Sequence, residues 1–286
     1  MPQINKKINC VRNIDISTVE GFGQEWAKFD QQRLSKNIIN KIFQDYFHIF
    51  PWNKIGLGPV GADIGCGSGR WAGCIAPRVQ LLHLVDASHQ ALSVARDNLK
   101  KIPNLVFHHA SVDALPFEDN SLDFAYSLGV LHHVPDTAGA IRDVTRKLKP
   151  GAPLLIYLYY RFDNRGFVFR VLWKISDYLR KIISHLPFFL RYWASQLLAL
   201  MVYFPLARIA KGLAACRILP EGWPLASYRD KPWYVLRTDA LDRFGTKLEK
   251  RFTRDEIESM MRVAGLKNIK FSNREPYWCC VGIKEG

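Results

Sequence analysis

A glycine-rich turn around residue 65 constrains the fold of this chain more than any other feature of its sequence. The apolar run at residues 60–64 leads directly into Gly65, Gly67 and Gly69. Glycine tolerates positive φ and lets the backbone pass close to a ligand. The dinucleotide fingerprint G-x-G-x-x-G would need its third glycine at position 70, where Arg70 stands, and the phosphate-binding motif G-x-x-x-x-G-K-[ST] is absent. The turn by itself indicates a nucleotide-like ligand.

Short apolar runs alternate with amphipathic stretches from about residue 59 to residue 160, which is typical of βαβ units around a parallel sheet. Residues 253–256 form a capping box that predicts a further helix, and two more apolar runs follow it. We therefore predict an α/β fold with a doubly wound, seven-stranded, mostly parallel sheet. The predicted strands cover residues 60–64, 81–85, 105–109, 122–127, 153–159, 268–272 and 277–283.

Asp86 follows the second predicted strand, 21 residues beyond Gly65. A carboxylate in this position can accept hydrogen bonds from both hydroxyls of a ribose. Together with the glycine turn, Asp86 fits an adenosine whose far end bears no diphosphate.

Six blocks, taken in order along the chain, resemble the motif series of class I S-adenosylmethionine-dependent methyltransferases. The nearest branch is the one that includes ubiquinone and menaquinone biosynthesis methyltransferases. The resemblance covers about residues 59–160 and, less specifically, 242–286. It implies a Rossmann-like fold, S-adenosylmethionine as cofactor with S-adenosylhomocysteine as product, and methyl transfer as the reaction. The blocks are residues 63–69, Asp86, 113–117, 123–127, 131–134 and 148–151.

The resemblance also implies which residues hold the cofactor. Gly65, Gly67 and Gly69 would wrap its methionine part, and Asp86 would bind its ribose. The implied cofactor-binding set is Asp63, Gly65, Cys66, Gly67, Gly69, Asp86, Ala87, Ser111, Val112, Asp113, Ser127 and Leu128.

The contact to the adenine is less clearly marked in the sequence. Many relatives carry an Asp at the position of Ser111 that contacts the adenine amino group, whereas here Asp113 stands two residues further on. Ser127 would lie near the methionine amino group of the cofactor, and Leu128 would lie near its base.

Three residues are candidate general bases for an acceptor hydroxyl or carbon acid. His132 and His133 fall in a loop at the carboxyl edge of the sheet, where ligands bind, and Asp163 follows the fifth strand. The histidines could equally cap the next helix or only shape the cofactor pocket. The eight histidines show no spacing typical of a metal site, so we predict no metal.

Four aromatic residues are candidate acceptor-binding residues. Tyr157, Tyr159 and Tyr160 come at the end of the fifth strand, and Trp26 belongs to an F-G-x-E-W segment that caps the cofactor cleft in some methyltransferases. The alternative for each of them is ordinary packing in the core or on an N-terminal helix.

Basic residues outnumber acidic ones by 40 to 26, which gives a formal net charge of +14. Such a charge favours an anionic partner, either a nucleotide, a nucleic acid or a membrane surface. The cysteines show no paired spacing, and residues 1–17 lack the apolar core of a secretory signal. We therefore expect reduced thiols and a cytoplasmic protein. The six cysteines are Cys10, Cys66, Cys74, Cys216, Cys279 and Cys280.

Residues 161–241 predict a basic, helical insertion after the fifth strand. Apolar side chains between residues 168 and 182 follow helical spacing, with Arg170, Lys174 and Lys181 on the opposite face. Residues 161–211 hold nine basic and two acidic residues, a net charge of +7. The uncharged stretch at 192–207 is sixteen residues long. That is short of the ~18 to 20 apolar residues of a bilayer span, so a transmembrane helix is disfavoured.

Three roles remain open for this insertion: a membrane-surface element, a lid over the acceptor site, or a dimer surface. A lipid-like acceptor would favour the first two together, and the protein would then lie peripherally at the inner membrane face. The sequence leaves the oligomeric state open. The predicted divisions are an N-terminal helical cap at 1–58, the cofactor-binding core at 59–160, the insertion at 161–241, and a C-terminal helix with the last two strands at 242–286.

We therefore predict methyl transfer from S-adenosylmethionine to a small or lipophilic acceptor by in-line displacement, with the insertion forming part of the acceptor site. The acceptor atom stays open. One alternative is an RNA methyltransferase, although residues 126–129 lack the [DNS]-P-P-[YFW] motif for amino groups of bases, which makes a nucleic acid partner less favoured. Another is a membrane-associated protein that binds the cofactor without catalysis.

Overall fold

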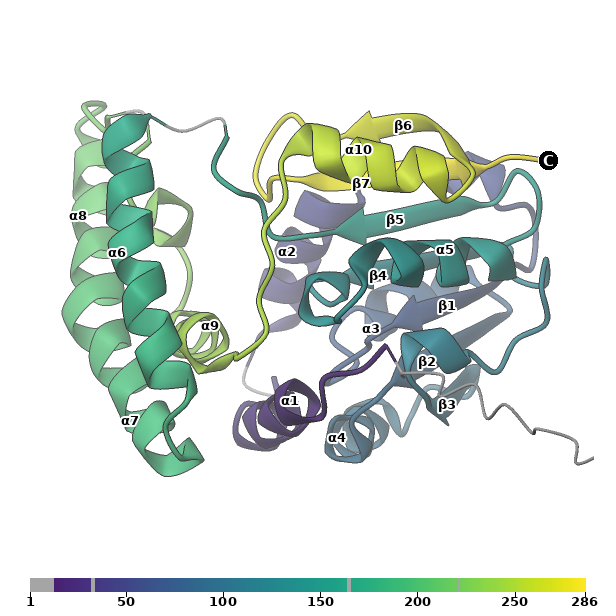
Figure 1. The fold of residues 1–286 in the computed structure, drawn as a ribbon, viewed down its shortest axis with the longest axis horizontal. Coiled ribbons are helices and arrows are strands. Elements are labelled where there is room, and N and C mark those ends of the chain that lie inside the picture. The colour runs from purple at the N-terminus through teal and green to yellow at the C-terminus, as the bar shows by residue number, and fades with distance from the viewer. Residues whose placement is uncertain (1–12, 32–33, 164–165, 221) are drawn as a thin grey trace, which may run out of the picture.

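The computed structural model describes residues 13–31, 34–163, 166–220 and 222–286, so Cys10 and Arg165 lie outside the described residues. Its centre is a seven-stranded sheet in the order β3-β2-β1-β4-β5-β7-β6 (Figure 1). All neighbouring strands pair in parallel except β7, which runs antiparallel to β5 and β6. The predicted sheet is therefore confirmed. The strands are β1 (Val60–Ile64), β2 (Leu81–Asp86), β3 (Leu105–His109), β4 (Phe124–Leu128), β5 (Pro153–Tyr157), β6 (Leu266–Phe271) and β7 (Cys279–Lys284).

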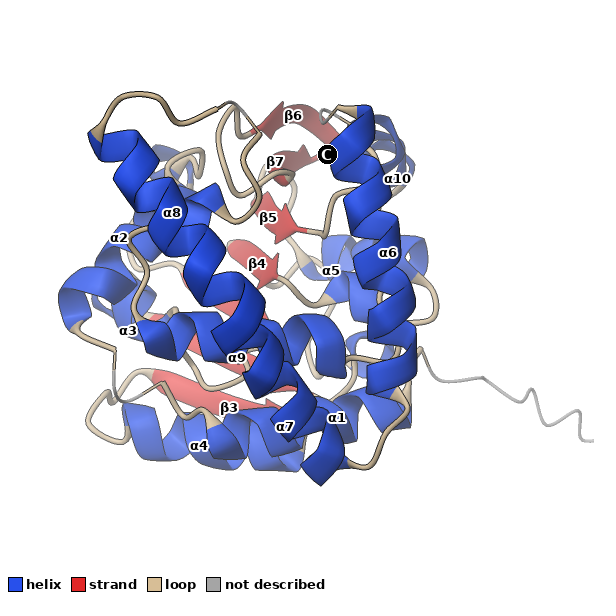
Figure 2. Ribbon diagram, turned by 90° about the vertical axis from the view of Figure 1, so that its left-hand side faces the viewer, coloured by secondary structure: helices blue, strands red, loops and turns tan. Residues whose placement is uncertain are grey.

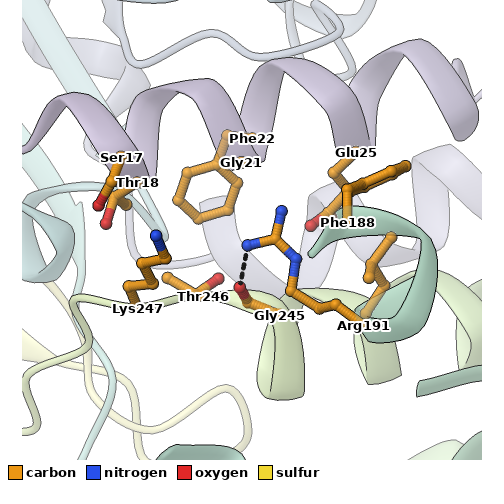
Figure 3. Close-up of a pocket in the computed structure, with 11 residues that line it drawn as sticks. Ser17, Thr18, Gly21, Phe22, Glu25, Phe188, Arg191, Gly245, Thr246 and Lys247 are labelled. Carbon is orange, nitrogen blue, oxygen red and sulfur yellow. Dashed lines mark hydrogen bonds between the residues drawn. The ribbon is translucent and has the colours of Figure 1, made fainter. Parts of the chain in front are cut away.

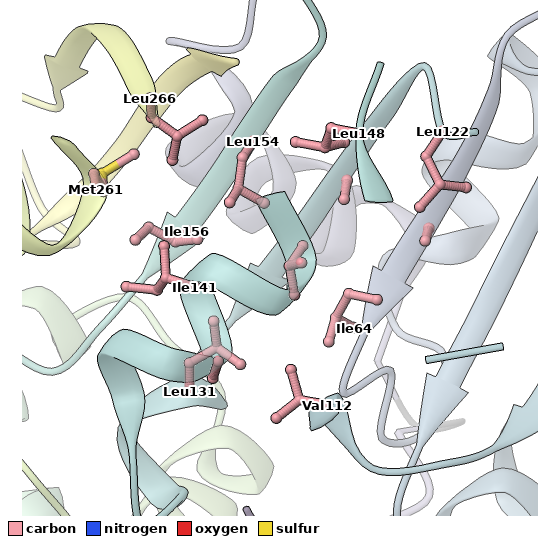
Figure 4. Close-up of a cluster of buried hydrophobic side chains, with 14 of the residues drawn as sticks. Ile64, Val112, Leu122, Leu131, Ile141, Leu148, Leu154, Ile156, Met261 and Leu266 are labelled. Atoms are coloured by element: carbon pink, nitrogen blue, oxygen red, sulfur yellow. The ribbon is translucent and has the colours of Figure 1, made fainter. Parts of the chain in front are cut away.

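Helices cover both faces of the sheet, as a doubly wound fold requires. On one face, Ile141 and Met261 pack with Leu154 and Ile156 in a cluster of buried apolar side chains (Figure 4). On α10, the Thr253 hydroxyl accepts from the Glu256 N–H at 3.2 Å, which confirms the predicted capping box. The core helices are α3 (Ala72–Ile75), α4 (His89–Leu99), α5 (Thr137–Lys147) and α10 (Arg254–Val263), with short helices η1 (Trp52–Lys54), η2 (Ala76–Arg78), η3 (Val112–Ala114) and η4 (Leu131–His133).

Two helices precede the sheet, α1 (Ile16–Lys28) and α2 (Lys36–Phe47). The Asp15 side chain caps α1 by accepting from the Thr18 N–H at 2.7 Å. Phe43 and Phe47 of α2 are buried on the second face of the sheet, where the Phe47 ring meets the Tyr126 ring edge-on at 5.3 Å. The N-terminal segment is thus packed onto the core.

The insertion forms a helical layer beside the carboxyl edge of the sheet (Figures 1 and 2). Its helices are α6 (Phe167–Ser184), α7 (Phe188–Leu198), η5 (Ala199–Tyr203, a π-helical turn), α8 (Phe204–Ala215), η6 (Ala226–Tyr228) and α9 (Trp233–Gly245). Because α9 extends to Gly245, it runs through the predicted division at residues 241/242.

Segments α7, η5 and α8 join into one helix of 28 residues, Phe188–Ala215. In the described part of the chain, it alone is long and apolar enough to cross a membrane, judged by length and composition only. The sequence analysis underestimated its length, since the helix continues past Arg191 and Arg208 and accommodates Pro205 near the π-helical turn. A buried core helix would also pass this test, but only 22% of this segment's apolar window is buried.

Two buried arginines anchor the insertion to the end of α9. Arg191 of α7 donates from Nη1 to the Gly245 carbonyl oxygen at 3.0 Å, at the seam where α1, α7 and α9 meet (Figure 3). Arg180 of α6 donates to the Thr246 carbonyl oxygen at 3.0 Å and pairs with Asp177 at 2.8 Å. These contacts hold α6 and α7 to the end of α9, and Arg191 also reaches α1 by donating to the Gln24 side chain at 3.2 Å.

We expect Arg180→Ala to lower the free energy of unfolding by about 1.5 to 3 kcal/mol, because it removes charge-assisted hydrogen bonds from a buried group. The matched control is Lys181→Ala, whose side chain is 65% exposed and pairs with the same Asp177. The control should change stability by less than about 0.5 kcal/mol. Urea unfolding measures both, and equal effects would show that Arg180 anchors nothing.

Candidate active site

A large cavity lies at the edge of the sheet where β1, β2, β4 and β5 end, and its volume is about 1070 Å³. Ligands of doubly wound sheets bind at this edge. The glycine turn and the residues after β2, β3 and β4 wall one part of the cavity, while aromatic side chains and helices of the insertion wall the other. Among the residues that the structure describes, no group of three His, Cys, Asp or Glu side chains is placed to hold a metal ion.

The glycine turn lies open to the cavity because its backbone adopts conformations that suit glycine. Gly65 has φ +80° and Gly67 has φ +53°. A Cβ on Gly67 would lie 2.9 Å from the Trp26 ring, so a side chain here would displace Trp26. Gly65, Cys66, Gly67 and Trp26 all line the cavity. Residue 67 must therefore be small for α1 to cover the turn.

Asp86 lies beside this turn, and each of its carboxylate oxygens accepts one hydrogen bond from the backbone. Its Oδ2 accepts from the Gly67 N–H at 2.9 Å, and its Oδ1 accepts from the Ser88 N–H at 2.8 Å. Burial raises the pKa of Asp86, while the two backbone hydrogen bonds lower it. A carboxylate has about four lone-pair sites, so two stay available for ligand hydroxyls on the cavity side. This geometry fits a ribose.

Of the residues predicted to lie near the adenine, the structure places some on the cavity wall and one away from it. Ala87, Ser111, Val112 and Leu128 line the cavity. Asp113 does not line it, because its carboxylate accepts hydrogen bonds from the Ser111 hydroxyl and from the Asn13 N–H, the latter at 2.9 Å. The prediction that Asp113 contacts the cofactor is corrected accordingly: Asp113 positions Ser111.

Three further predicted cofactor residues lie behind the cavity wall rather than on it. Asp63 points into the second face of the sheet and is 2% exposed, and this burial raises its pKa to about 8. Ser127 is buried and donates to the Ile64 carbonyl oxygen at 2.8 Å. Gly69, at φ +74°, closes the turn against Leu99. Asp63 and Ser127 lie on strands, where side chains alternate between the two faces of the sheet, so they point away from the cavity. All three residues support the glycine turn without lining the cavity.

All four predicted acceptor-side aromatic residues, Trp26, Tyr157, Tyr159 and Tyr160, line the cavity. The Tyr157 and Tyr159 ring centroids are 5.8 Å apart, so the two rings form a continuous wall beyond β5. Aromatic side chains therefore line the cavity next to the part that is walled by the glycine turn and Asp86.

The two histidines differ in their access to the cavity. His133 lines it, and its Nδ1 donates to the Leu248 carbonyl oxygen at 2.7 Å, which leaves the Nε2 lone pair without a protein partner. Burial lowers the pKa of His133 to about 4, so this ring is a weak base. His132 is fully buried, stacks on Tyr159 at 3.9 Å between ring centroids, and is not part of the cavity wall. His132 thus packs behind the cavity wall, a position that does not support it as a general base.

Asp163 also lies outside the cavity wall. Its carboxylate accepts from the Arg254 N–H at 3.2 Å and from the Trp278 ring N–H at 3.1 Å, and the residue is exposed. These two contacts tie Asp163 to the start of α10 rather than to the cavity wall. We remove Asp163 from the candidate bases.

The structure instead brings Asp242 of α9 to the wall of the cavity, where the Tyr159 hydroxyl donates to its carboxylate. Burial, together with nearby Asp239 and Glu249, raises the pKa of Asp242 to about 7, although the Tyr159 hydrogen bond and Arg243 act to lower it. A pKa close to neutrality is what a general base needs. The sequence analysis missed Asp242, because no motif links residue 159 to a carboxylate 83 positions later.

Comparison with known proteins agrees with this architecture. Residues 62–156 match the methyltransferase domain family. The 2-phytyl-1,4-naphtoquinone methyltransferase of Nostoc punctiforme is 30% identical over 146 residues, which is 49% of this chain and 59% of that protein. The demethylmenaquinone methyltransferase of Staphylococcus haemolyticus is 30% identical over 111 residues, 38% of this chain and 46% of that protein. The phosphoethanolamine N-methyltransferase 2 of Caenorhabditis elegans is 34% identical over 100 residues, 34% of this chain and 23% of that protein.

The chain thus spans between 23% and 59% of the length of these relatives. Among solved structures, the methyltransferase in complex with the Haloferax volcanii Trm112 activator has a TM-score of 0.51 at 14% identity, covering 93% of this chain and 98% of that one. A SAM-dependent methyltransferase of Methanosarcina mazei has a TM-score of 0.50 at 16% identity, covering 83% of this chain and 98% of that one. These likenesses support the fold. Residues 62–156 therefore match the methyltransferase domain family, and the chain as a whole has the Rossmann-like fold of these methyltransferase structures.

Proposed function

We propose that the protein transfers a methyl group from S-adenosylmethionine to a lipophilic small molecule bound in the same cavity. The observation that carries this proposal is the continuity of the cavity from Asp86 and the glycine turn to the aromatic wall at Tyr157 and Tyr159. Its volume of about 1070 Å³ is slightly above the roughly 300 to 1,000 Å³ that ligand pockets occupy, which leaves room for two ligands at once.

The residues around the glycine turn fit this cofactor. Asp86 would hold the ribose hydroxyls, Gly65 and Gly67 would lie along the amino-acid tail, and Ser111 and Leu128 would face the base. When bound, S-adenosylmethionine supplies an activated methyl group on a positively charged sulfur. The protein then has to align the acceptor with that group and exclude water.

Asp242 and Tyr159 would remove the proton from an acceptor hydroxyl or carbon acid. The proton would pass to the Asp242 carboxylate, either directly or through the Tyr159 hydroxyl that already donates to it. Because burial holds the pKa of Asp242 at about 7, the carboxylate can accept this proton near neutral pH. His133 would remain neutral and shape the cavity wall.

Several observations support a lipophilic acceptor. The acceptor half of the cavity is walled by aromatic side chains from the core and by the insertion, including Trp173 of α6 and Tyr203 of η5. Two of the relatives are named for a naphthoquinone and for demethylmenaquinone as acceptors. By contact with this half of the cavity, the insertion would form part of the acceptor site and exclude water from it.

The proposal is tested by incubating the protein with S-adenosylmethionine labelled in the methyl group and a total lipid extract. We expect label to move into an organic-soluble product, which mass spectrometry then identifies. Cofactor binding without any labelled product in lipid or metabolite fractions would favour a binding protein, and label in RNA would favour the nucleic acid alternative.

A further inference from the structure

An apolar surface covers the outside of the helical layer, and we call it the outer hairpin face. Its side chains are strongly exposed: Phe167 by 73%, Tyr178 by 71% and Phe189 by 69%. On both arms of the hairpin they follow helical spacing, so they form stripes along α6 and along the α7–α8 helix. The face consists of Phe167, Val171, Ile175, Tyr178 and Ile182 on α6, and Phe189, Trp193, Leu197, Leu200 and Met201 on the α7–α8 helix. Monomeric proteins rarely leave so much apolar surface in one place.

The inner side of the same helices is already occupied by the protein. Ala199, Tyr203 and Ala207 are buried against Leu236 and Ala240 of α9. The long helix therefore lies along the protein rather than standing free, although its length would suffice to cross a bilayer. Only the outer hairpin face is left for another partner, which suits a helix lying in the plane of a membrane surface.

The charge of the hairpin matches an anionic surface. Arg170, Lys174 and Lys181 are exposed on α6. The sequence analysis set them opposite the apolar stripe, but exposed Phe167 and Tyr178 lie three or four residues from them and extend the stripe to their edge. Residues 161–211 carry a net charge of +7 of the chain's +14, and since Arg180 and Arg191 are buried, the exposed basic side chains supply the attraction to an anionic surface. Basic side chains that border an apolar stripe bind acidic headgroups while the stripe enters the interface.

The cavity reaches exposed residues of both arms of the hairpin, beside the outer hairpin face. Leu172 of α6 and Val202 of η5 line the cavity, and they are also 52% and 39% exposed. Figure 2 looks onto the layer and shows α6 and α8 diverging, with the ends of β4 and β5 visible between them. We place a mouth of the cavity at these two residues, between the arms; further exposed lining residues, Lys41 and Asp230, lie outside the two arms.

We infer that the outer hairpin face docks on an anionic lipid bilayer, such as the inner face of a cell membrane, with the mouth of the cavity toward the lipid. The identity of the molecule that enters the cavity rests on the proposed function. That molecule, the methyl acceptor, would be dissolved in the membrane and would enter between Leu172 and Val202 without crossing water. The docking itself depends only on the hairpin.

The first test is flotation of the full chain with vesicles of phosphatidylcholine and phosphatidylglycerol, with phosphatidylcholine alone for comparison. We expect binding to the anionic vesicles, and weakening by high salt. The double variant Ile175→Glu/Trp193→Glu should lose binding by about tenfold or more, since both side chains are over half exposed and lie on the face. Lys174→Ala should weaken it about fivefold at low ionic strength.

The matched control is Val263→Glu, which adds a charge to an apolar side chain 75% exposed on α10 and should float like the unmodified chain. In the same samples, hydrogen exchange should slow on vesicle addition across 167–184 and 188–215 and stay unchanged across α4. Calorimetry with S-adenosylhomocysteine tests the cofactor site separately, so a failure of the proposed function is distinguishable from a failure of docking.

Absence of flotation, or flotation that the double variant leaves intact, would overturn the inference. A dimer in solution that the double variant dissociates, without vesicle binding, would also overturn it and assign the face to a second copy of the chain.

Discussion

Asp242→Asn is expected to lower the rate of methyl transfer by about 10²- to 10⁴-fold, the range that a general base contributes. Asparagine keeps the size of the side chain and can still accept from the Tyr159 hydroxyl, but it cannot take up a proton. Cofactor binding should stay near its original strength, because Asp242 lies in the aromatic half of the cavity, away from Asp86. The measurement is single-turnover transfer of labelled methyl to the acceptor found in lipid extract.

The pH dependence of the same reaction identifies the base. Since Asp242 acts when deprotonated and its pKa is raised to about 7, the rate should rise about tenfold per pH unit below 7 and level off above it. His133, with its pKa lowered to about 4, would place the inflection near 4 instead.

The matched control for Asp242→Asn is Asp163→Asn, since Asp163 is the carboxylate among the three candidate bases of the sequence analysis. It should retain the original rate, because Asp163 holds the start of α10 outside the cavity. An Asp242→Asn protein with full activity, or an unchanged inflection near 7 in that variant, would contradict the role of Asp242.

Asp86→Ala is expected to weaken S-adenosylhomocysteine binding by about 1.5 to 3 kcal/mol, or roughly ten- to 150-fold, through lost hydrogen bonds to the ribose. The substitution also removes the acceptor for the Gly67 N–H, so it loosens the turn that passes the amino-acid tail. Isothermal titration calorimetry measures the dissociation constant directly.

A carboxylate on the adjoining helix supplies the control for Asp86. Asp97→Ala removes an exposed carboxylate from α4 and should leave the dissociation constant unchanged. Thermal unfolding of each variant shows whether the fold is intact. Equal binding by the Asp86→Ala protein and the unmodified chain would refute the ribose contact.

The core could be predicted from sequence because its signals are local. The alternation of apolar runs and the spacing of Gly65, Gly67 and Asp86 gave the sheet and the cofactor edge, since parallel strands bring their carboxyl ends together. Asp63 and Asp113 were predicted to bind the cofactor, but neither lines the cavity. Their positions in the motif were correct, but strand alternation and the hydrogen bond from Ser111 turn their side chains away.

The acceptor half was less accessible to sequence reasoning because its contacts are long-range. Asp242 reaches Tyr159 only when α9 lies beside the segment that follows β5, and no periodic pattern in the sequence indicates that contact. The α7–α8 helix was underestimated because the charges at Arg191 and Arg208 seemed to bound it, whereas both side chains bond to backbone carbonyls of the protein.

The most direct test of the central claim is a crystal structure of the protein with S-adenosylhomocysteine. The ribose hydroxyls should lie within hydrogen-bond distance of Asp86, and the sulfur should face the wall formed by Tyr159 and Asp242. An empty cavity at saturating nucleoside, or a nucleoside whose sulfur points away from Tyr159, would contradict the account.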